Sequence, residues 1–402
     1  MSSETRNTLY LCYFGLREPL VQTQVLPYLR EIAKDDFTVH LLTFEPDFRE
    51  KWTAEQIAEE KRKLVSEGIH WNCFPYHKSP SVPATLYDVF AGARYARRLI
   101  RQNGVSILHA RAHVPVLMAL AAKLSTSCKV IFDIRGLVAE EYADAGVWNE
   151  KSAGFRFTKK IETLGLKHAD RIVVLTGKMK DYLVEKGLRV SEEISVVPCC
   201  VDFSRTSNDV EEAATKNERF ELIYAGSVTG LYLLEEMGRF FLELKKRKED
   251  AFFRVLTSTP NAVGKVFSNL GIAAGDFEAS FVKPADVLFQ VRKARLAISF
   301  RKPTFSQMAA SPTKIPEYLA AGVAVVTNAG IGDMDAIIEQ ENVGVVVRNF
   351  DSASLSEAVD TALRLLREEE IAARCVNAAK EKFDLVNVGG KAYRRLYKGI
   401  FD

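Results

Sequence analysis

Short apolar runs and longer amphipathic segments alternate along the whole chain. The apolar runs are rich in β-branched and aromatic residues and mostly continuous, which predicts strands buried on both faces. They lie at 8–14, 37–44, 105–109, 129–134, 170–176 and 193–197, and again at 220–225, 252–257, 277–282, 295–300, 323–328 and 343–347. Between them, apolar positions three and four residues apart predict helices, most clearly over 83–102 and 352–370. The pattern predicts an α/β fold with parallel sheets covered by helices.

A polar segment divides this pattern into two similar halves. Residues 203–219 (FSRTSNDVEEAATKNER) are charged and poor in apolar side chains, so we predict a domain boundary there. The expected organisation is an N-terminal domain over 1–205 and a C-terminal domain over 206–388, each doubly wound and Rossmann-like. Sheets of this kind bind ligands at the carboxyl ends of their strands. We therefore expect the two domains to face each other across a cleft in which two ligands meet.

Composition and charge exclude several classes of protein. The chain has 402 residues, of which 47% are hydrophobic and 27% charged, as in a globular protein of two domains and unlike a disordered or rod-like one. The net charge of +3 argues against nucleic acid as a partner. The six cysteines form no CxxC pair and have no histidine at zinc-ligand spacing, and we expect no metal. A polar N-terminus without a signal-peptide pattern favours the cytoplasm.

The most informative segment is 310–332 (ASPTKIPEYLAAGVAVVTNAGIG). Pro312 favours the start of a helix, and Ser311 is placed to cap it. Lys314 then falls in the first turn, where the positive end of the helix dipole calls for an anionic partner such as phosphate. Glu317 lies one turn later on the same face. The alternative is a solvated lysine that forms a surface salt bridge with this glutamate.

This segment and others in the same order resemble the signature segments of GT-B glycosyltransferases, in the family 4-like group. The other matching segments are 24–28 (QVLPY), 109–115 (HARAHVP), 132–136 (FDIRG), 169–176 (ADRIVVLT), 197–202 (VPCCVD) and the start of the second half at 226–237. The resemblance covers nearly the whole chain. It implies a C-terminal domain that binds a nucleotide-sugar donor and an N-terminal domain that binds the acceptor.

The resemblance assigns roles to four residues of the signature segment. Lys314 would contact the diphosphate of the donor, and Ser311 and Thr313 would add hydrogen-bond donors to it. Glu317 would accept hydrogen bonds from the ribose hydroxyls.

The turn after the first strand of the second half completes the expected donor site. Gly226 and Ser227 would let backbone N–H groups approach phosphate. Relatives often carry basic residues in this loop, which the chain lacks, and Arg301 and Lys302 could supply that charge instead. Many relatives also carry a glutamate where Ala309 stands here.

In the N-terminal domain, the resemblance implies an acceptor site at the ends of the strands. The candidate residues are Gly15, His109, Arg111, Asp133 and Arg135. Arg111 and His113 join Lys314 and Glu317 as the candidate catalytic residues. The histidines could instead be structural, and Asp133 and Arg135 could form an ion pair that shapes the cleft.

Two further segments have expected roles. Residues 154–168 (GFRFTKKIETLGLKH) combine aromatic and basic side chains, which suggests peripheral contact with an anionic membrane at its inner face. The alternative is a surface helix that packs its apolar side on the sheet. The C-terminal helix, 389–402, resembles a segment that crosses back onto the N-terminal domain.

The resemblance implies a glycosyltransferase of the hexosyl type. It would transfer a sugar from a UDP- or GDP-sugar to a glycan, lipid-linked or small-molecule acceptor, with retention of configuration and without a metal or other cofactor. Polysaccharide biosynthesis is the expected setting. Two alternatives stay open, namely a nucleotide-sugar 2-epimerase of the same fold and a non-catalytic scaffold subunit that binds nucleotide-sugar.

Overall fold

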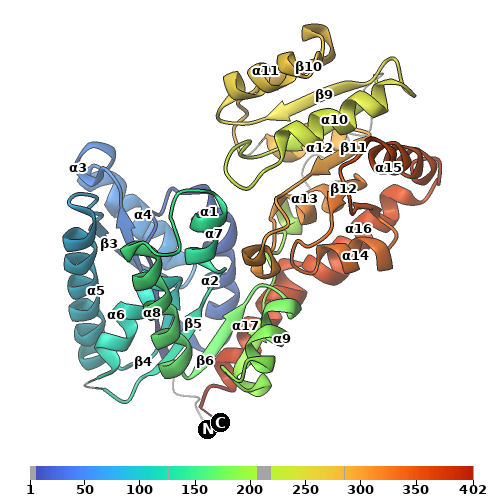
Figure 1. Cartoon of the computed structure of the whole chain (residues 1–402). Coiled ribbons are helices and arrows are strands. Elements are labelled where there is room, and N and C mark those ends of the chain that lie inside the picture. Colours follow the sequence, from blue (N-terminus) through green and yellow to red (C-terminus); the bar gives the residue numbers. More distant parts are fainter. Residues whose placement is uncertain (1–5, 125, 206–218, 285, 402) are drawn as a thin grey trace. The chain divides into compact units, whose positions relative to one another are not determined.

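The computed structural model describes residues 6–124, 126–205, 219–284 and 286–401 (Figure 1). Backbone contacts divide the chain into two compact units. Unit 1 comprises Met1–Ala143, Val147–Pro198 and Leu385–Asp402, and unit 2 comprises Asp144–Gly146 and Cys199–Asp384. The division thus falls between Pro198 and Cys199, ahead of the predicted boundary at 205. Residues 206–218, most of the polar segment, lie outside the described residues.

Unit 1 contains a seven-stranded parallel sheet with the order β3-β2-β1-β4-β5-β6-β7. The strands are β1 (Arg6–Cys12), β2 (Phe37–Glu45), β3 (Ile69–Pro75), β4 (Val105–Arg111), β5 (Lys129–Asp133), β6 (Arg171–Val174) and β7 (Ile194–Val196). The helices are α1 (Pro19–Gln24), α2 (Leu26–Ala33), α3 (Phe48–Lys51), α4 (Ala54–Ser66), α5 (Ser81–Asn103), α6 (His113–Lys123), α7 (Val138–Asp144), α8 (Ala153–His168), α9 (Gly177–Glu185) and α17 (Lys391–Lys398). The strand order reverses between β1 and β4, where sheets of this kind place their ligands.

Unit 2 repeats this plan with six parallel strands in the order β10-β9-β8-β11-β12-β13. The strands are β8 (Glu221–Ala225), β9 (Phe252–Leu256), β10 (Phe277–Ser280), β11 (Leu296–Ser299), β12 (Val325–Asn328) and β13 (Gly344–Val347). The helices are α10 (Leu234–Lys245), α11 (Pro260–Asn269), α12 (Val287–Lys293), α13 (Lys314–Ala320), α14 (Met334–Gln340), α15 (Ser352–Leu365) and α16 (Ile371–Phe383). Here the order reverses between β8 and β11.

Helices lie on both faces of each sheet (Figure 1). The strands next to each reversal are accordingly buried on both sides, and every residue of β11 and β12 is buried. In unit 2, aromatic rings fill much of the space between sheet and helices, as in the packing of Phe253 on Phe241 and Phe267. The prediction of two doubly wound α/β sheets is confirmed.

The main differences from the predicted elements have simple causes. Strand β3 was not predicted, because it lies at the sheet edge and its sequence, IHWNCFP, contains polar residues in place of a continuous apolar run. The helix predicted over 352–370 ends at Leu365, and α16 begins at Ile371. The predicted start of the first of these helices, α15, is confirmed, since Asp351 accepts a hydrogen bond from the Ser354 N–H.

The last residues of the chain pack on unit 1. A π-helical turn over Leu385–Gly390 leads into α17. From α17, Tyr393 donates a hydrogen bond to the Asp133 carboxylate at 2.9 Å, and Arg394 forms an ion pair with Glu31 of α2. Tyr397 lies 2.8 Å from His109. The C-terminal helix is therefore tied to the inner strands of the unit 1 sheet.

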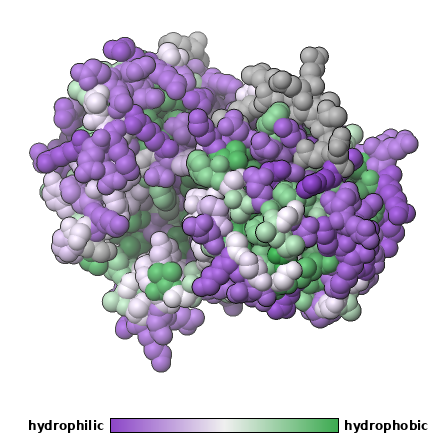
Figure 2. Space-filling view, turned by 90° about the horizontal axis from the view of Figure 1, so that it is seen from above, coloured by the Kyte–Doolittle hydropathy of each residue, from purple (hydrophilic) through white to green (hydrophobic). Residues whose placement is uncertain are grey.

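Hydrophilic side chains predominate on the face shown in Figure 2, with smaller areas of hydrophobic residues between them. Among the described residues, we find no helix with both the length and the apolar character needed to cross a bilayer.

Two glycines test the packing of unit 2 in opposite directions. A Cβ atom on Gly344 of β13 would lie 2.0 Å from the Val325 carbonyl oxygen, so Gly344→Ala should lower the free energy of unfolding by about 2 kcal/mol or more. Gly264 lies inside α11 with no atom within 4 Å of an added Cβ, and Gly264→Ala should raise it by about 0.5–1 kcal/mol. Urea unfolding measures both changes, and equal effects of the two variants would contradict this account of the packing.

Candidate functional site

In unit 2, three predicted donor residues lie where the strand order reverses. Gly226 directly follows β8, Arg301 closely follows β11, and Lys314 opens α13. Gly226 has φ of 142°, and an added Cβ would lie 2.7 Å from the Lys314 Nζ. Glycine is therefore required at 226, both for its backbone conformation and for the approach of the lysine.

Lys314 is buried against two tyrosines. Its Nζ donates a hydrogen bond to the Tyr224 hydroxyl at 3.0 Å and lies 3.8 Å from the centre of the Tyr232 ring. Only 7% of the residue is exposed. Burial lowers the pKa of Lys314, although Tyr232 opposes this effect. A charged amine in such a place is costly to desolvate and is stabilised by a nearby anion.

Arg301 contacts the same tyrosine as Lys314. Its guanidinium lies 4.9 Å from the centre of the Tyr232 ring, and Nη1 donates to the Tyr232 hydroxyl at 3.3 Å. Nε donates to Gln307 Oε1 at 2.7 Å, which fixes the guanidinium. The positive charge of Arg301 also lowers the pKa of Lys314. Two cations on one ring form a place where a diphosphate would relieve their repulsion.

The first turn of α13 differs from the prediction. The helix begins at Lys314, and Thr313 at the N-cap position makes no side-chain cap hydrogen bond. The expected cap, Ser311, is buried and its Oγ accepts a hydrogen bond from the Cys199 N–H at 3.1 Å. Ser311 therefore fixes the segment 310–313 to the chain around Cys199, and the assignment of Ser311 as helix cap is wrong.

The remaining predicted donor residues lie around this centre. Glu317 is half-buried one turn along α13, and its charge favours the protonated form of Lys314. Ser227 is exposed, with its Oγ 3.3 Å from Thr229 Oγ1. The backbone N–H of Lys302 donates to the Leu231 carbonyl. Ala309 is 1% exposed at the end of a short 3-10 helix over Phe305–Ala309, so a carboxylate at this position would be buried.

In unit 1, several of the predicted acceptor residues lie around one buried carboxylate, that of Asp133. Asp133 ends β5, next to His109 and Arg111 of β4. Its Oδ2 lies 3.6 Å from His109 Nε2 and 3.7 Å from Arg111 Nη1, and its Oδ1 lies 3.7 Å from Arg135 Nη1. Burial disfavours the charge on Asp133, but Arg135, His109 and Arg111 together lower its pKa to about 2. Burial lowers the pKa of His109.

The burial of this cluster revises two predicted roles. His109 and Asp133 have 0% exposed surface, and a side chain without accessible surface cannot touch an acceptor. His109 lies 2.8 Å from the Tyr397 hydroxyl and Asp133 accepts from Tyr393. In this structure the two residues therefore support Arg111 and Arg135 instead of contacting an acceptor.

His113 lies apart from the cluster, since the chain leaves the strand after Arg111. Ala112 takes a left-handed φ of 69°, and His113 begins α6. His113 Nε2 lies 3.4 Å from Glu162 Oε2 on α8, and Glu162 also pairs with Lys159. The helix start thus places His113 beside Glu162 of α8 and not beside Asp133.

Unit 1 also contains a pocket of about 570 Å³ at the carboxyl edge of its sheet. We call it the aromatic pocket. It is lined by Tyr13, Phe14, Gly15, Glu18, Phe44, Pro46, Tyr76, Arg111, Ala112, His113, Val114, Pro115, Val138, Glu141 and Tyr142. Two predicted acceptor residues, Gly15 and Arg111, line this pocket together with the catalytic candidate His113.

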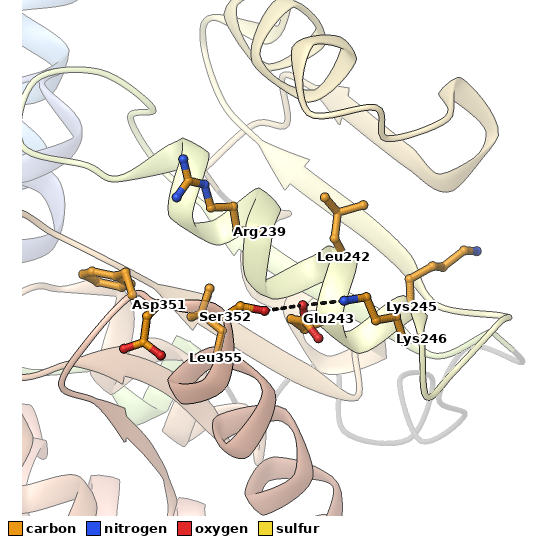
Figure 3. A pocket seen from close by; sticks show the side chains of 9 residues that line it. Arg239, Leu242, Glu243, Lys245, Lys246, Asp351, Ser352 and Leu355 are labelled. Atoms are coloured by element: carbon orange, nitrogen blue, oxygen red, sulfur yellow. Dashed lines mark hydrogen bonds and ion pairs between the residues drawn. The ribbon is translucent and has the colours of Figure 1, made fainter.

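A different pocket, of about 560 Å³, lies between α10 and the start of α15 (Figure 3). Glu243 occupies its centre, accepting hydrogen bonds from Ser352 at 3.3 Å and from Lys246 at 2.6 Å. None of the predicted donor residues lines it. We therefore do not assign it to the donor.

Several residues of both centres escaped sequence reasoning. They are Tyr224, Gln307 and Asn328 in unit 2, and Tyr10, Glu162, Tyr393 and Tyr397 in unit 1. Position at a strand end could have drawn attention to Tyr224, two residues before Gly226. The spacing of four between Tyr393 and Tyr397 indicates one helix face, but nothing in the sequence identifies its partners.

The charge of Asp133 gives a pH-dependent prediction. Its folded pKa lies below the ordinary value of 3.8, so the ionised carboxylate stabilises the fold above that pH, by on the order of 2 kcal/mol. Arg135→Gln removes the largest of the opposing charges and should lower the stability most above about pH 5. The deficit should shrink as the pH falls from about 4 towards 2. Urea unfolding at several pH values measures it, with Arg156→Gln on the surface of α8 as the control, and a deficit independent of pH would contradict the role of Asp133.

Comparison with known proteins agrees with the fold described above. The model of the family described as Glycosyltransferase Family 4 matches residues 21–205. A search of the curated proteins found no matching sequence. Among solved structures, a glycosyltransferase from Rickettsia africae is 14% identical with a TM-score of 0.69, covering 99% of each chain.

Two further structures are similar over almost the whole length. The Anabaena HepE protein in complex with UDP is 14% identical with a TM-score of 0.64, covering 98% of this chain and 100% of its own. A UDP-N-acetylglucosamine 2-epimerase is 11% identical with a TM-score of 0.59, covering 99% and 96%. At these identities the likeness establishes the fold. Residues 21–205 thus match the model of Glycosyltransferase Family 4, and the chain as a whole has the GT-B fold of these structures.

Proposed function

We propose that the chain transfers a hexosyl group from a UDP- or GDP-sugar to an acceptor hydroxyl, with retention of configuration and without a metal cofactor. The observation that carries the proposal is the cation pair of unit 2. The Lys314 Nζ and the Arg301 guanidinium lie 3.8 and 4.9 Å from the centre of the Tyr232 ring, and Lys314 packs closely on Gly226. The UDP in the HepE complex supports a uridine nucleotide as the first donor to test.

The cation pair suits the departure of a nucleoside diphosphate. In the transfer, the bond between the anomeric carbon and the phosphate oxygen breaks, and its electron pair leaves with the diphosphate. Lys314 and Arg301 would stabilise the negative charge that develops there, because they are fixed before the reaction begins. The acceptor oxygen bonds to the anomeric carbon and its proton passes to a phosphate oxygen of the leaving group, so the step is balanced without a protein base.

The other predicted donor residues complete the proposed binding mode. Glu317 would accept hydrogen bonds from the ribose hydroxyls, and Ser227, Thr313 and Lys302 would contact the phosphates. The buried Ser311 would act indirectly, by holding the segment that precedes Lys314.

The acceptor would bind in the aromatic pocket of unit 1. Aromatic rings form much of its wall, and Arg111 brings a positive charge to it. Such a lining fits a sugar ring or an apolar carrier, since both stack on aromatic faces. A glycan, a lipid-linked glycan and a small molecule are all compatible with this site. We place the reaction in the cytoplasm, at the inner face of the membrane, as part of polysaccharide biosynthesis.

Two alternatives are supported by particular observations. The epimerase among the similar structures favours a 2-epimerase, which would release free UDP and an altered sugar without an acceptor. Ala309, in place of a carboxylate, favours a scaffold subunit that binds donor and turns nothing over. Incubation with UDP-sugars separates the three, since transfer needs an acceptor, epimerisation does not, and a scaffold gives no product.

The donor site is tested by thermal shift with UDP, GDP, ADP and TDP. Lys314→Met keeps most of the side-chain volume and removes the charge. Because the charge is buried, the unliganded variant should melt at the same temperature as the wild type or higher. The nucleotide-dependent shift should largely vanish, since a ligand stabilises only in proportion to its binding.

Lys265→Met is the matched control, because Lys265 is an exposed lysine on α11 of the same unit. It should keep the full nucleotide shift. A Lys314→Met protein that binds as well as the wild type would rule out the assigned donor site.

A further inference from the structure

Helix α5 presents apolar side chains to solvent as well as to the protein. Its inner side buries Ala84, Ala93, Ala96 and Leu99. On the other side, the exposed fractions are 60% for Val82, 50% for Leu86, 60% for Tyr87 and 65% for Phe90. Val82, Leu86 and Phe90 are spaced by four residues and therefore form one stripe along the helix. In Figure 1, α5 runs along the outer edge of unit 1.

The exposed side continues into a row of cations. Arg94, Arg98 and Arg101 are exposed on the following turns of the helix. The acidic residue of α5, Asp88, is 1% exposed and bonded to Tyr13 and His77. The exposed side of α5 thus combines large apolar side chains with positive charge and carries no carboxylate. We call it the outer face of α5, and it consists of Val82, Leu86, Tyr87, Phe90, Arg94, Arg98 and Arg101.

We propose that the outer face of α5 docks on an anionic membrane surface. Apolar side chains of this size enter the boundary between headgroups and acyl chains, and arginines on the same face pair with anionic lipids. The two features together favour lipid over another protein as the occupant. A protein partner would need an apolar region and a separate anionic region in matching positions, whereas an anionic bilayer surface offers both everywhere.

The outer face of α5 is connected to the aromatic pocket by direct contacts. Tyr13, in the pocket wall, donates a hydrogen bond to Asp88 at 2.7 Å. His77 Nδ1 lies 2.6 Å from the other oxygen of Asp88, and the His77 ring packs edge-on against Tyr87 at 5.1 Å between centroids. One layer of side chains therefore separates the pocket wall from the membrane-docking face.

This proximity identifies the acceptor class. A lipid-linked acceptor in the bilayer surface would present its headgroup next to the aromatic pocket, whereas a soluble acceptor needs no such face. This step rests on the proposed function, but the docking itself does not.

Helix α8 provides a matched comparison. This is the segment in which the sequence suggested membrane contact, and it exposes Phe157 and Leu164, each at 44%. Its Lys159 is occupied by Glu140 and Glu162. With fewer exposed apolar side chains than α5, α8 is the weaker membrane surface.

The experiment is co-sedimentation of the full chain with vesicles of phosphatidylcholine alone or mixed with phosphatidylglycerol. The wild type should bind the anionic vesicles and lose binding at high salt. The variant Leu86→Ser/Phe90→Ser should bind roughly tenfold or more weakly. The variant Arg94→Gln/Arg98→Gln/Arg101→Gln should bind roughly a hundredfold more weakly. Phe157→Ser/Leu164→Ser on α8 should bind like the wild type.

Several results would overturn the proposal. They are equal binding of wild type to both vesicle types, an equal loss in the α8 variant, or a wild-type dimer that Leu86→Ser/Phe90→Ser converts to a monomer. All variants should keep the nucleotide-dependent thermal shift of the wild type, which shows that they are folded. Vesicle binding without any sugar transfer would leave the docking intact and refute the proposed function alone.

Discussion

A charged side chain that is buried at the edge of a sheet needs an opposite charge nearby to offset its loss of hydration. The two units differ in where that opposite charge comes from. In unit 1, Asp133 is surrounded by cations of the same unit and by a tyrosine from α17. In unit 2, Lys314 contacts two tyrosines, and among the described residues no carboxylate forms an ion pair with it. The carboxylate in unit 1 thus has cationic partners within its own unit, whereas we propose that the buried lysine in unit 2 finds its partner in a bound anion. This contrast is why we assign a ligand to one buried charge and a supporting role to the other.

The buried groups of unit 1 also explain why the C-terminal helix α17 packs on this unit. Tyr393 and Tyr397 reach Asp133 and His109 from a helix that follows all of unit 2 in the sequence. Their hydroxyls satisfy groups that burial has removed from water, and an unsatisfied group there would be costly. The C-terminal helix thus contributes to the support of Arg111, which borders the aromatic pocket. A change in α17 can therefore alter the pocket without touching it.

The sequence predicts the sheets well because continuous apolar runs mark strands that are buried on both faces. The grouping of Gly226, Arg301 and Lys314 is implied by the resemblance to GT-B glycosyltransferases, and the structure places all three at the reversal of the strand order. The sequence does not predict β3, whose edge position permits polar residues, or the contact of Ser311 with Cys199, which joins distant parts of the chain. Nor does it predict Tyr393 beside Asp133. Contacts between side chains far apart in the sequence depend on how the elements pack. The local pattern of apolar and polar residues does not predict them.

Helix α5 shows how burial changes the meaning of an apolar pattern. The sequence shows only that the helix has apolar positions three and four residues apart, which one buried face explains. The structure shows that the buried side consists mainly of alanines together with Leu99, while Val82, Leu86, Tyr87 and Phe90 are exposed. Side chains that stay at least half exposed remove little apolar surface from water, so the outer stripe contributes little to the stability of the fold. The exposed side of α5 therefore has large apolar side chains outside the core, arginines next to them and no exposed carboxylate. Such a surface is best explained by binding to something other than the chain itself.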